Sequence, residues 1–395
     1  MSFDFDKTYE DFCADLSEKH LYRQLPKYQP NGLVADFSSN DYLGLSKHRR
    51  LKHAASDALD LWGLGSTGSR LLSGNVPCHE ALEAVIAKAK GTQAALVFSS
   101  GYQANATVLG ALLDKRTLKK EAVVFTDRLN HASLHHACRY AGVTQQRFHH
   151  NDMDHLESLL QAHAQQDKAL FIVAETVYGM DGDCANLDRL YELAHRFSAF
   201  LYLDEAHATG MLGHEGYGLT AQRKNPPPMI AMGTFSKAIG CSGAYIACSL
   251  AVKNYLLNRC TGFVYSTAPP PAISAAVMTA LKMLPTMGQE RQKTLDMAQS
   301  LRTHCARLGL DTGQSTTHIV PIVVGDETRT LQLKAFLLER GLLTSAVRPP
   351  TVPPGTARVR IALCSHHTAS QLNALTAALD AWCKIQAVAT PSLSN

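Results

Sequence analysis

Near the middle of the chain stands Ala199-Phe200-Leu201-Tyr202-Leu203-Asp204, a short apolar run that ends in an acid. Such a run is typical of a strand buried on both faces of a parallel sheet. Ligands of open α/β sheets bind at the carboxyl edge of the strands, so Asp204 is predicted to lie at a binding edge. His207 follows three residues later, in a loop from which its ring could reach the same ligand.

A second segment completes this pattern. Residues 229–232 predict the next strand, and Thr234-Phe235-Ser236-Lys237 follows it. A lysine amine can form a Schiff base with the aldehyde of pyridoxal 5'-phosphate (PLP), and a carboxylate can keep the pyridine nitrogen of that cofactor protonated. Taken singly, Asp204 could be a helix N-cap and Lys237 a solvated lysine. Their occurrence on consecutive strand ends favours a PLP site.

A phosphate site is predicted at another strand end. Residues 94–100 are expected to form a strand, and the residues from Gly101 to Asn105 to open a helix. A glycine at this junction lets the backbone N–H groups of Gly101 and Tyr102 face an anion at the positive end of the helix.

A histidine follows one further predicted strand, residues 122–127. His131 lies just past the strand end, where its ring can lie flat on the pyridine ring of the cofactor. His131 and His135 also stand i, i+4 on a predicted helix, a spacing that metal ligands use. Because no third ligand and no HExxH pattern accompany them, we predict no metal site.

These segments belong to a series of motifs that runs along nearly the whole chain. The motifs are Phe37-Ser38-Ser39-Asn40-Asp41-Tyr42-Leu43-Gly44-Leu45, Gly65-Ser66-Thr67-Gly68-Ser69-Arg70, Ser73-Gly74, Ser100-Gly101-Tyr102, Asn130-His131-Ala132-Ser133, Met180-Asp181-Gly182-Asp183, Asp204-Glu205-Ala206-His207, Thr234-Phe235-Ser236-Lys237 and Tyr265-Ser266-Thr267. In this order they resemble the α-oxoamine synthases of the fold type I PLP-dependent superfamily. The resemblance implies an α/β fold with a mostly parallel seven-stranded sheet in a large domain and a small α+β C-terminal domain.

The resemblance also implies a role for each matching residue. Four catalytic roles are implied: the Schiff-base lysine, the partner of the pyridine nitrogen, the stacking residue and the donor to the phenolic oxygen, which are Lys237, Asp204, His131 and His207. Further cofactor contacts fall on Ser100, Gly101, Tyr102 and Thr234. Ser266 and Thr267 match the stretch through which the neighbouring subunit of a homodimer reaches the phosphate. The substrate-binding residues implied are Arg23, Asn40, Thr351 and Arg360, with Asn40 and Arg360 on the amino-acid carboxylate, a task that suits an arginine fork.

One position departs from the family pattern. Gly179 stands where relatives usually carry a serine bonded to the cofactor. The missing hydroxyl removes one hydrogen bond and leaves its role to His207 or to water.

The implied reaction is a decarboxylative condensation of an amino acid with an acyl thioester. Residues 346–353 and 357–360 resemble the members that join L-alanine to a pimeloyl thioester, on CoA or on a carrier protein, for biotin synthesis. Glycine or serine with an acetyl, succinyl or long-chain acyl group remain alternatives within the family. An aminotransferase and a non-catalytic partner subunit are alternatives outside it, and Lys237 argues against the latter.

The alternation of predicted strands and helices suggests four segments. They are an N-terminal helix and arm (residues 1–60), a PLP-binding large α/β domain (61–285), a C-terminal α+β domain (286–386) and a flexible tail (387–395). Gly63-Leu64-Gly65-Ser66-Thr67-Gly68 matches the dinucleotide pattern G-x-G-x-x-G, but it follows a predicted helix rather than a strand. A loop that lines an acyl-CoA or substrate channel is the better interpretation.

Composition agrees with a large enzyme. The chain has 395 residues, 46% of them apolar and 18% charged, and a formal net charge of +4. The charges are spread out without a basic run, which argues against a nucleic-acid partner. The ten cysteines show no CxxC spacing, which favours reduced thiols in the cytoplasm. The start is polar and acidic and no apolar run reaches membrane length, so we expect a cytoplasmic protein without a membrane partner.

Overall fold

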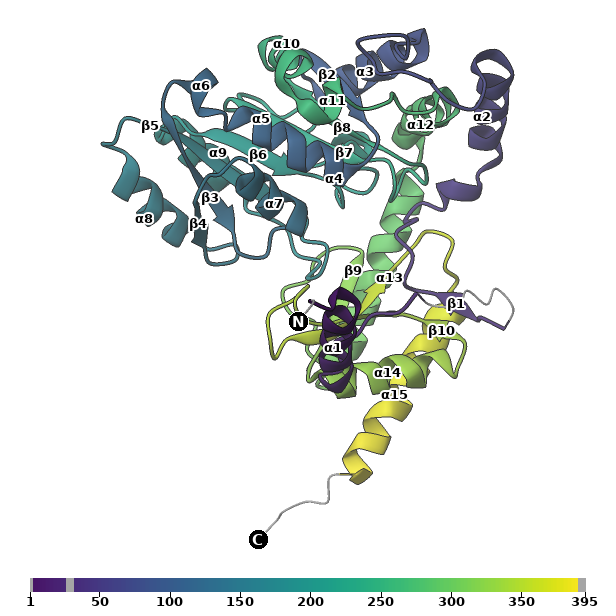
Figure 1. The fold of residues 1–395 in the computed structure, drawn as a ribbon. Coiled ribbons are helices and arrows are strands. Elements are labelled where there is room, and N and C mark those ends of the chain that lie inside the picture. The colour runs from purple at the N-terminus through teal and green to yellow at the C-terminus, as the bar shows by residue number, and fades with distance from the viewer. Residues whose placement is uncertain (1–2, 26–31, 390–395) are drawn as a thin grey trace. The chain divides into compact units, whose positions relative to one another are not determined.

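The computed structural model describes residues 3–25 and 32–389, which fall into two compact units (Figure 1). The large unit comprises Asn40–Gly179 and Asp183–Thr294. The small unit comprises the described residues of Met1–Ser39, Met180–Gly182 and Leu295–Asn395.

The large unit is built around a seven-stranded sheet with the strand order β2-β8-β7-β6-β5-β3-β4. Its strands are β2 (Ala94–Phe98), β3 (Glu121–Asp127), β4 (Gln145–Phe148), β5 (Lys168–Glu175), β6 (Phe200–Asp204), β7 (Met229–Thr234) and β8 (Ala244–Cys248). Only β8 runs antiparallel to its neighbours, β2 and β7. The predicted mostly parallel, seven-stranded sheet is therefore confirmed.

The helices of the large unit lie before β2, between the parallel strands, as parallel pairing requires, and after β8. They are η1 (Leu45–Lys47), α2 (Arg49–Trp62), α3 (Pro77–Lys90), α4 (Gly101–Ala104), η2 (Asn105–Leu109), α5 (Gly110–Leu112), α6 (Lys115–Leu118), α7 (Ala132–Tyr140), α8 (Met153–His163), α9 (Leu187–Arg196), η3 (His214–Gly216), α10 (Leu250–Arg259), α11 (Thr261–Val264), α12 (Pro271–Met283), η4 (Leu284–Thr286) and the first part of α13 (Gly288–Arg307).

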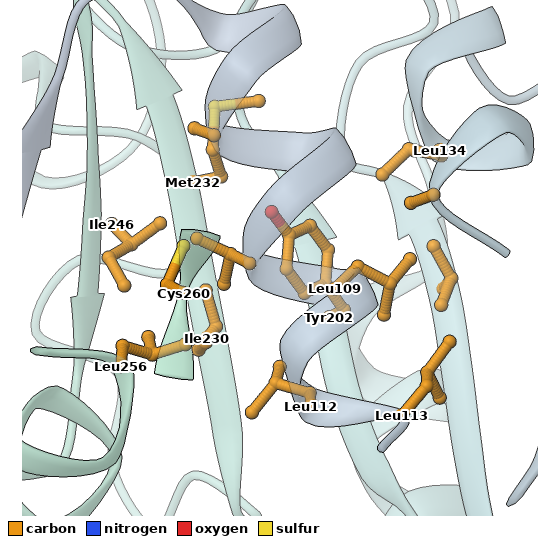
Figure 2. Close-up of a cluster of buried hydrophobic side chains, with 14 of the residues drawn as sticks. Leu109, Leu112, Leu113, Leu134, Tyr202, Ile230, Met232, Ile246, Leu256 and Cys260 are labelled. Atoms are coloured by element: carbon orange, nitrogen blue, oxygen red, sulfur yellow. The ribbon is translucent and has the colours of Figure 1, made fainter. Parts of the chain in front are cut away.

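Alternate residues of the strands enter two apolar cores. Tyr202 lies in one core and Leu201 and Leu203 in the other. Figure 2 shows the first core, in which Leu109 and Leu112 of the helical run after β2 lie over the sheet beside Ile230. Each leucine or isoleucine buried in this way contributes roughly 1.5–3 kcal/mol relative to exposure. The continuous apolar runs of the sequence follow from this two-sided burial.

The small unit has two sheets and four helical segments. A three-stranded antiparallel sheet has the order β11-β12-β9, and β1 pairs with β10 in parallel. The elements are α1 (Phe5–Glu18), β1 (Ala35–Asp36), the second part of α13, β9 (Ile319–Gly325), α14 (Glu327–Leu338), β10 (Leu342–Leu343), β11 (Ser345–Val347), β12 (Ala357–Ala362) and α15 (Ala369–Ala389). Their shared core includes Leu301, Ile322, Leu337, Ile361 and Leu379.

The two units have other boundaries than the segments expected from the sequence. The N-terminal arm divides at residues 39 and 40 rather than at 60, because β1 pairs with β10 in the small unit whereas α2 packs against α12 in the large one. The second boundary lies inside α13, at residues 294 and 295 rather than 285 and 286. The expected tail began at 387, but α15 continues to Ala389, and residues 390–395 lie outside the described part of the chain.

Candidate active site

Two acids lie side by side at the carboxyl edge of the large sheet. Asp204 ends β6, and its partner in the register with β5 is Glu175. Lys237 follows β7 in a tight loop, where its carbonyl oxygen accepts the N–H of Gly240 at 2.8 Å. Gly240 has φ of +68°, a conformation that glycine adopts without strain. The sheet topology therefore places Asp204 and Lys237 on adjacent strand ends.

Asp204 is buried, with 4% of its surface exposed, and two neutral donors hold it. Its Oδ2 atom accepts Nδ2–H of Asn105 at 2.7 Å, and its Oδ1 atom accepts the backbone N–H of Ala206 at 2.8 Å. Asp204 therefore ends a strand and stabilises a turn, and the alternative of a helix N-cap is wrong.

Asn105 is a site residue that the sequence reasoning missed. Its Nδ2 atom also donates to Ser133 Oγ at 3.0 Å, and its Oδ1 atom accepts the hydroxyl of Tyr202 at 2.9 Å. The residue begins η2, a π-helical turn within the helical run from Gly101 to Leu112. Such turns often occur at functional sites, but the sequence carries no simple signal for them.

His131 is the N-cap of α7, so it does not lie within that helix as predicted. Its Nδ1 atom lies 2.7 Å from Ser133 Oγ. His135 belongs to the helix and its Nδ1 atom lies 2.6 Å from Gln145 Oε1. The i, i+4 spacing of the two histidines therefore does not place them as a pair on one helical face.

Glu175 anchors His131, and the sequence reasoning missed this residue too. The backbone N–H of His131 donates to Glu175 Oε1 at 2.5 Å. Burial and the neighbouring charge of Asp204 raise the pKa of Glu175 well above its ordinary value, although Lys237 and the N–H of His131 oppose this. Burial lowers the pKa of His131 below its ordinary value. The charge of Asp204 opposes this shift, and the charge of Lys237 adds to it. The four groups therefore share one electrostatic environment.

The predicted phosphate residues lie at the start of the helical run after β2. Ser100 is the N-cap, and its Oγ atom accepts the N–H of Gln103 at 3.1 Å. A Cβ atom on Gly101 would lie 2.6 Å from Cγ2 of Thr234, so only a glycine lets the helix begin this close to the end of β7. The hydroxyl of Tyr102 pairs with Nδ1 of His136.

Ser266 and Thr267 lie near this helix start in the same chain. Ser266 Oγ accepts Nε2–H of Gln103 at 2.7 Å, and Thr267 forms an antiparallel bridge with Ser69. The neighbouring Ala268 N–H donates to the carbonyl oxygen of Gly68 at 2.9 Å. The glycine-rich loop thus follows a helix, α2, and pairs with this segment.

His207 is buried in the large unit, with 7% of its surface exposed. Its Nδ1 atom lies 2.7 Å from the hydroxyl oxygen of Tyr42, and that oxygen lies 2.9 Å from Oδ1 of Asn40. A Cβ atom on Gly179 would lie 2.2 Å from Nε2 of His207. The ring therefore fills the space that a side chain at position 179 would need.

The small unit brings together two of the predicted substrate residues. Arg23 donates an N–H to Oγ1 of Thr351 at 2.9 Å. Arg348 donates to the carbonyl oxygens of His20 and Tyr22, which anchors this part of the N-terminal segment. Burial lowers the pKa of Arg348, and the charge of Arg23 lowers it further.

Arg360, the remaining predicted substrate residue, lies in β12 of the small unit. It is buried, with 4% of its surface exposed, and its register partners are Ser345 of β11 and Pro321 of β9.

Both acids of the Met180–Asp183 motif form ion pairs. In the small unit Asp181 pairs with Arg358. In the large unit Oδ2 of Asp183 lies 3.0 Å from Nε2 of His150, whose Nδ1 atom lies 3.0 Å from Oδ1 of Asp127. Burial would lower the pKa of His150, but the hydrogen bonds and charges of the two acids outweigh it and raise this pKa to about 10.

Two clusters among the described residues have the composition of a metal site. They are Cys364, His366 and His367, and His149, Asp152 and His155. His367 already uses both ring nitrogens, because Nδ1 accepts the N–H of Cys364 and Nε2 bonds to the carbonyl oxygen of Asp36.

Known proteins resemble this chain over almost its whole length. The family Aminotransferase class I and II matches residues 34–379. A putative 8-amino-7-oxononanoate synthase of Magnetococcus marinus is 47% identical over 94% of this chain and 96% of its own. The 8-amino-7-oxononanoate synthase of Gluconacetobacter diazotrophicus is 47% identical over 95% of this chain and 97% of its own. The chain belongs to the 8-amino-7-oxononanoate synthase family.

Solved structures agree with this family and with the fold. Serine palmitoyltransferase of S. paucimobilis with a bound PLP–myriocin aldimine has a TM-score of 0.89 at 25% identity and covers 98% of this chain and 100% of its own. The 8-amino-7-oxononanoate synthase of Francisella tularensis has a TM-score of 0.77 at 26% identity and covers 91% of this chain and 99% of its own. The predicted fold type I architecture and enzyme class, a PLP-dependent acyltransferase of this family, are confirmed.

The residues of this 8-amino-7-oxononanoate synthase family member fit PLP. Asp204 is a buried carboxylate with neutral donors, and a protonated pyridine nitrogen would give it a cationic partner. Gly101 begins a helix without a side chain at the place where backbone N–H groups can face a phosphate. Lys237 supplies an amine on the adjacent strand end.

Within residues 3–25 and 32–389, every helix is too short or too polar to be a candidate membrane span.

Proposed function

We propose that this chain joins L-alanine to a pimeloyl thioester in the biotin pathway. The α-carbon of alanine forms a bond to the acyl carbonyl carbon, the thiol of CoA or of a carrier protein leaves, and the alanine carboxyl group leaves as carbon dioxide. The product is 8-amino-7-oxononanoate. The names of the relatives support this reaction, and so does the arginine pair of the small unit.

The observation that carries the choice of acyl group is the cluster of Arg23, Arg348 and Thr351. A pimeloyl chain ends in a free carboxylate, whereas acetyl and fatty acyl chains end in a methyl group. Arginine binds carboxylates through paired N–H donors, and a neighbouring cation adds to the attraction. Arg23, supported by Thr351 and beside the charge of Arg348, therefore suits the distal end of a dicarboxylic acyl chain.

Bound PLP would supply an electron sink for the electron pair left behind when the amino acid loses its α-proton. Lys237 holds the cofactor before the substrate arrives, and its amine then takes the α-proton and later returns a proton to the product carbon. Asp204, fixed by Asn105 and Ala206, pairs with the pyridine nitrogen. His131, anchored by Glu175, packs on the ring and assists the acyl oxygen.

Further residues bind the two ends of the cofactor and the amino acid. Ser100, Gly101, Tyr102 and Thr234 hold the phosphate, and Ser266 and Thr267 reach it from the neighbouring subunit of a homodimer. His207 donates to the phenolic oxygen. Asn40 and Arg360 bind the amino-acid carboxylate.

Specific observations favour two other reactions as the second and third candidates. The TM-score of 0.89 with a serine palmitoyltransferase favours L-serine and a long acyl chain as the second candidate. The match to Aminotransferase class I and II names a third, which would form a keto acid without releasing a thiol.

The deciding experiment measures thiol release by the PLP-loaded enzyme. L-alanine, glycine and L-serine are each paired with pimeloyl-CoA, heptanoyl-CoA, acetyl-CoA and palmitoyl-CoA. We expect release with L-alanine and pimeloyl-CoA, and a clear preference over heptanoyl-CoA, which has the same chain length but no carboxylate. Release with L-serine and palmitoyl-CoA instead would contradict the proposal, and keto acid without thiol would indicate transamination.

Arg23→Gln tests the role of the arginine. Loss of a charge-assisted hydrogen bond at an exposed arginine should lower kcat/KM for pimeloyl-CoA by about tenfold. The value for heptanoyl-CoA should stay within about twofold, because that chain has no carboxylate to lose. An equal loss with both thioesters would show that Arg23 serves folding or the CoA portion rather than the distal carboxylate.

A further inference from the structure

A buried tyrosine connects two residues with different predicted tasks. Tyr42 is fully buried, and its hydroxyl oxygen lies 2.7 Å from Nδ1 of His207 and 2.9 Å from Oδ1 of Asn40. Asn40 is proposed to bind the amino-acid carboxylate, and His207 is proposed to face the phenolic oxygen of the cofactor. One hydroxyl group therefore lies between the substrate end and the cofactor end of the site.

The hydrogen positions of Asn40, Tyr42 and His207 depend on one another, because a hydroxyl group has a single hydrogen to donate. When Tyr42 donates to Oδ1 of Asn40, as the geometry has it, Nδ1 of His207 must carry the hydrogen of its contact with Tyr42. Nε2 can then donate to the cofactor only if the ring holds a second proton and a positive charge. When Tyr42 donates to His207 instead, a neutral ring already has its hydrogen on Nε2.

Binding of the amino acid favours the first of these two arrangements, in which Tyr42 donates to Oδ1 of Asn40. A carboxylate accepts hydrogen bonds, so it draws the NH2 group of Asn40 toward itself. The oxygen of the same amide then faces Tyr42 and accepts its hydroxyl hydrogen. That leaves His207 with hydrogen on Nδ1, and a donor contact to the phenolic oxygen requires the charged ring.

Contacts at both ring nitrogens fix the position of the His207 ring. Nε2 lies against Gly179, where a Cβ atom would come within 2.2 Å. Nδ1 is fixed by Tyr42, which itself packs in the interior. The neighbouring acid, Asp41, bonds to the hydroxyl and the backbone N–H of Ser46.

We propose that Tyr42 is a positioning residue that couples binding of the amino-acid carboxylate at Asn40 to the hydrogen-bonding state of His207 at the cofactor. This rests on the proposed function only in taking an amino acid as the substrate; neither the acyl group nor the choice among alanine, glycine and serine enters it. Amino-acid binding thereby favours uptake of a proton from the solvent by His207, which places a positive charge next to the phenolic oxygen at the time when the cofactor must accept electrons.

The test compares Tyr42→Phe with Tyr245→Phe in PLP-loaded enzyme. Tyr245 is also buried, but its hydroxyl group pairs with Oγ1 of Thr209 at 3.1 Å rather than with a histidine, so its variant controls for the loss of a buried hydroxyl. The absorbance of the bound cofactor is recorded alone and during titration with L-alanine, glycine and L-serine, without any thioester.

We expect Tyr42→Phe to change the cofactor spectrum before any amino acid is added and to weaken binding of all three amino acids by about tenfold. Tyr245→Phe should match the wild type in both measurements. If Tyr42→Phe and the wild type share spectrum and affinities, or if both variants change alike, the coupling is absent.

Asn40→Asp separates the two ends and does not depend on a buried position. The aspartate keeps an oxygen for Tyr42 but has no NH2 group for the carboxylate. We expect weaker amino-acid binding together with a changed spectrum of the amino-acid-free enzyme, because the aspartate always accepts the hydroxyl hydrogen of Tyr42 and so favours the charged ring of His207. An unchanged spectrum would overturn the assignment of the two ends. If the wild-type spectrum responds to none of the amino acids, the coupling and the proposed function both fail. A response of the wild type without an effect of Tyr42→Phe removes the coupling alone.

Discussion

At the residue scale, Glu175 ends β5 beside Asp204 and accepts the backbone N–H of His131 at 2.5 Å. Burial and the charge of Asp204 raise the pKa of Glu175 well above its ordinary value, so the charged carboxylate is less favoured here than in water. Glutamine has the same shape and retains an oxygen for His131. We therefore expect Glu175→Gln to stay within about threefold of wild-type kcat, while Glu175→Leu loses about 10- to 100-fold because the N–H of His131 is left unpaired. Steady-state kinetics at saturating substrate compare the two. Equal losses would mean that Glu175 acts as a charged group.

A second residue, Gly179, limits the position of His207. Alanine at 179 would place its Cβ atom 2.2 Å from Nε2 of the ring, so the ring must turn away from its contact with Tyr42. We expect Gly179→Ala to weaken PLP binding by about tenfold, the equivalent of one lost hydrogen bond. Equilibrium dialysis of the apoenzyme with PLP measures this. Gly288→Ala is the control, because its Cβ atom would make only an ordinary contact at 3.9 Å. The same affinity in all three proteins would show that His207 can move without cost.

At the element scale, the sequence predicted strands better than the contacts between their ends. The run ending in Asp204 identified β6, and the run ending in Glu175 has the same form, so this acid could have been found by the same rule. Asn105 could not, because its role depends on a π-helical turn that brings it to Asp204 and Tyr202. The boundary at residue 39 depends on the pairing of β1 with β10, which are two residues long and far apart in sequence. Such pairing leaves no local pattern.

His150, in the loop after β4, joins the end of β3 to the segment after β5. His150 contacts Asp127 at 3.0 Å and Asp183 at 3.0 Å, and its pKa is raised from 6.5 to about 10. A histidine whose pKa is higher in the folded state stabilises the fold fully below about pH 6.5, and this contribution disappears as the pH rises through about 10.

Urea unfolding of wild type and His150→Gln tests this linkage. We expect the variant to be less stable by roughly 2–4 kcal/mol near pH 6.5, because two buried acids lose their cation. The difference should shrink steadily as the pH approaches about 10. A difference that is constant with pH would indicate lost packing rather than a lost charge.

At the scale of the whole molecule, we expect each active site to be completed by the neighbouring subunit of a homodimer. Ser266 contacts Gln103 within its own chain, yet the family resemblance assigns Ser266 and Thr267 to the phosphate of the neighbouring subunit.

A mixture of two inactive variants distinguishes a site within one chain from a site shared between two chains. One variant is Lys237→Ala, and the other carries Ser266→Ala and Thr267→Ala together. If the sites are shared, a hybrid dimer contains one site with both Lys237 and the intact pair. Mixed in equal amounts and exchanged to equilibrium, the two should then recover about one quarter of wild-type activity. Differently tagged chains and sequential affinity purification verify that hybrids have formed. Hybrids without activity would place Lys237 and the serine–threonine pair in the same chain's site.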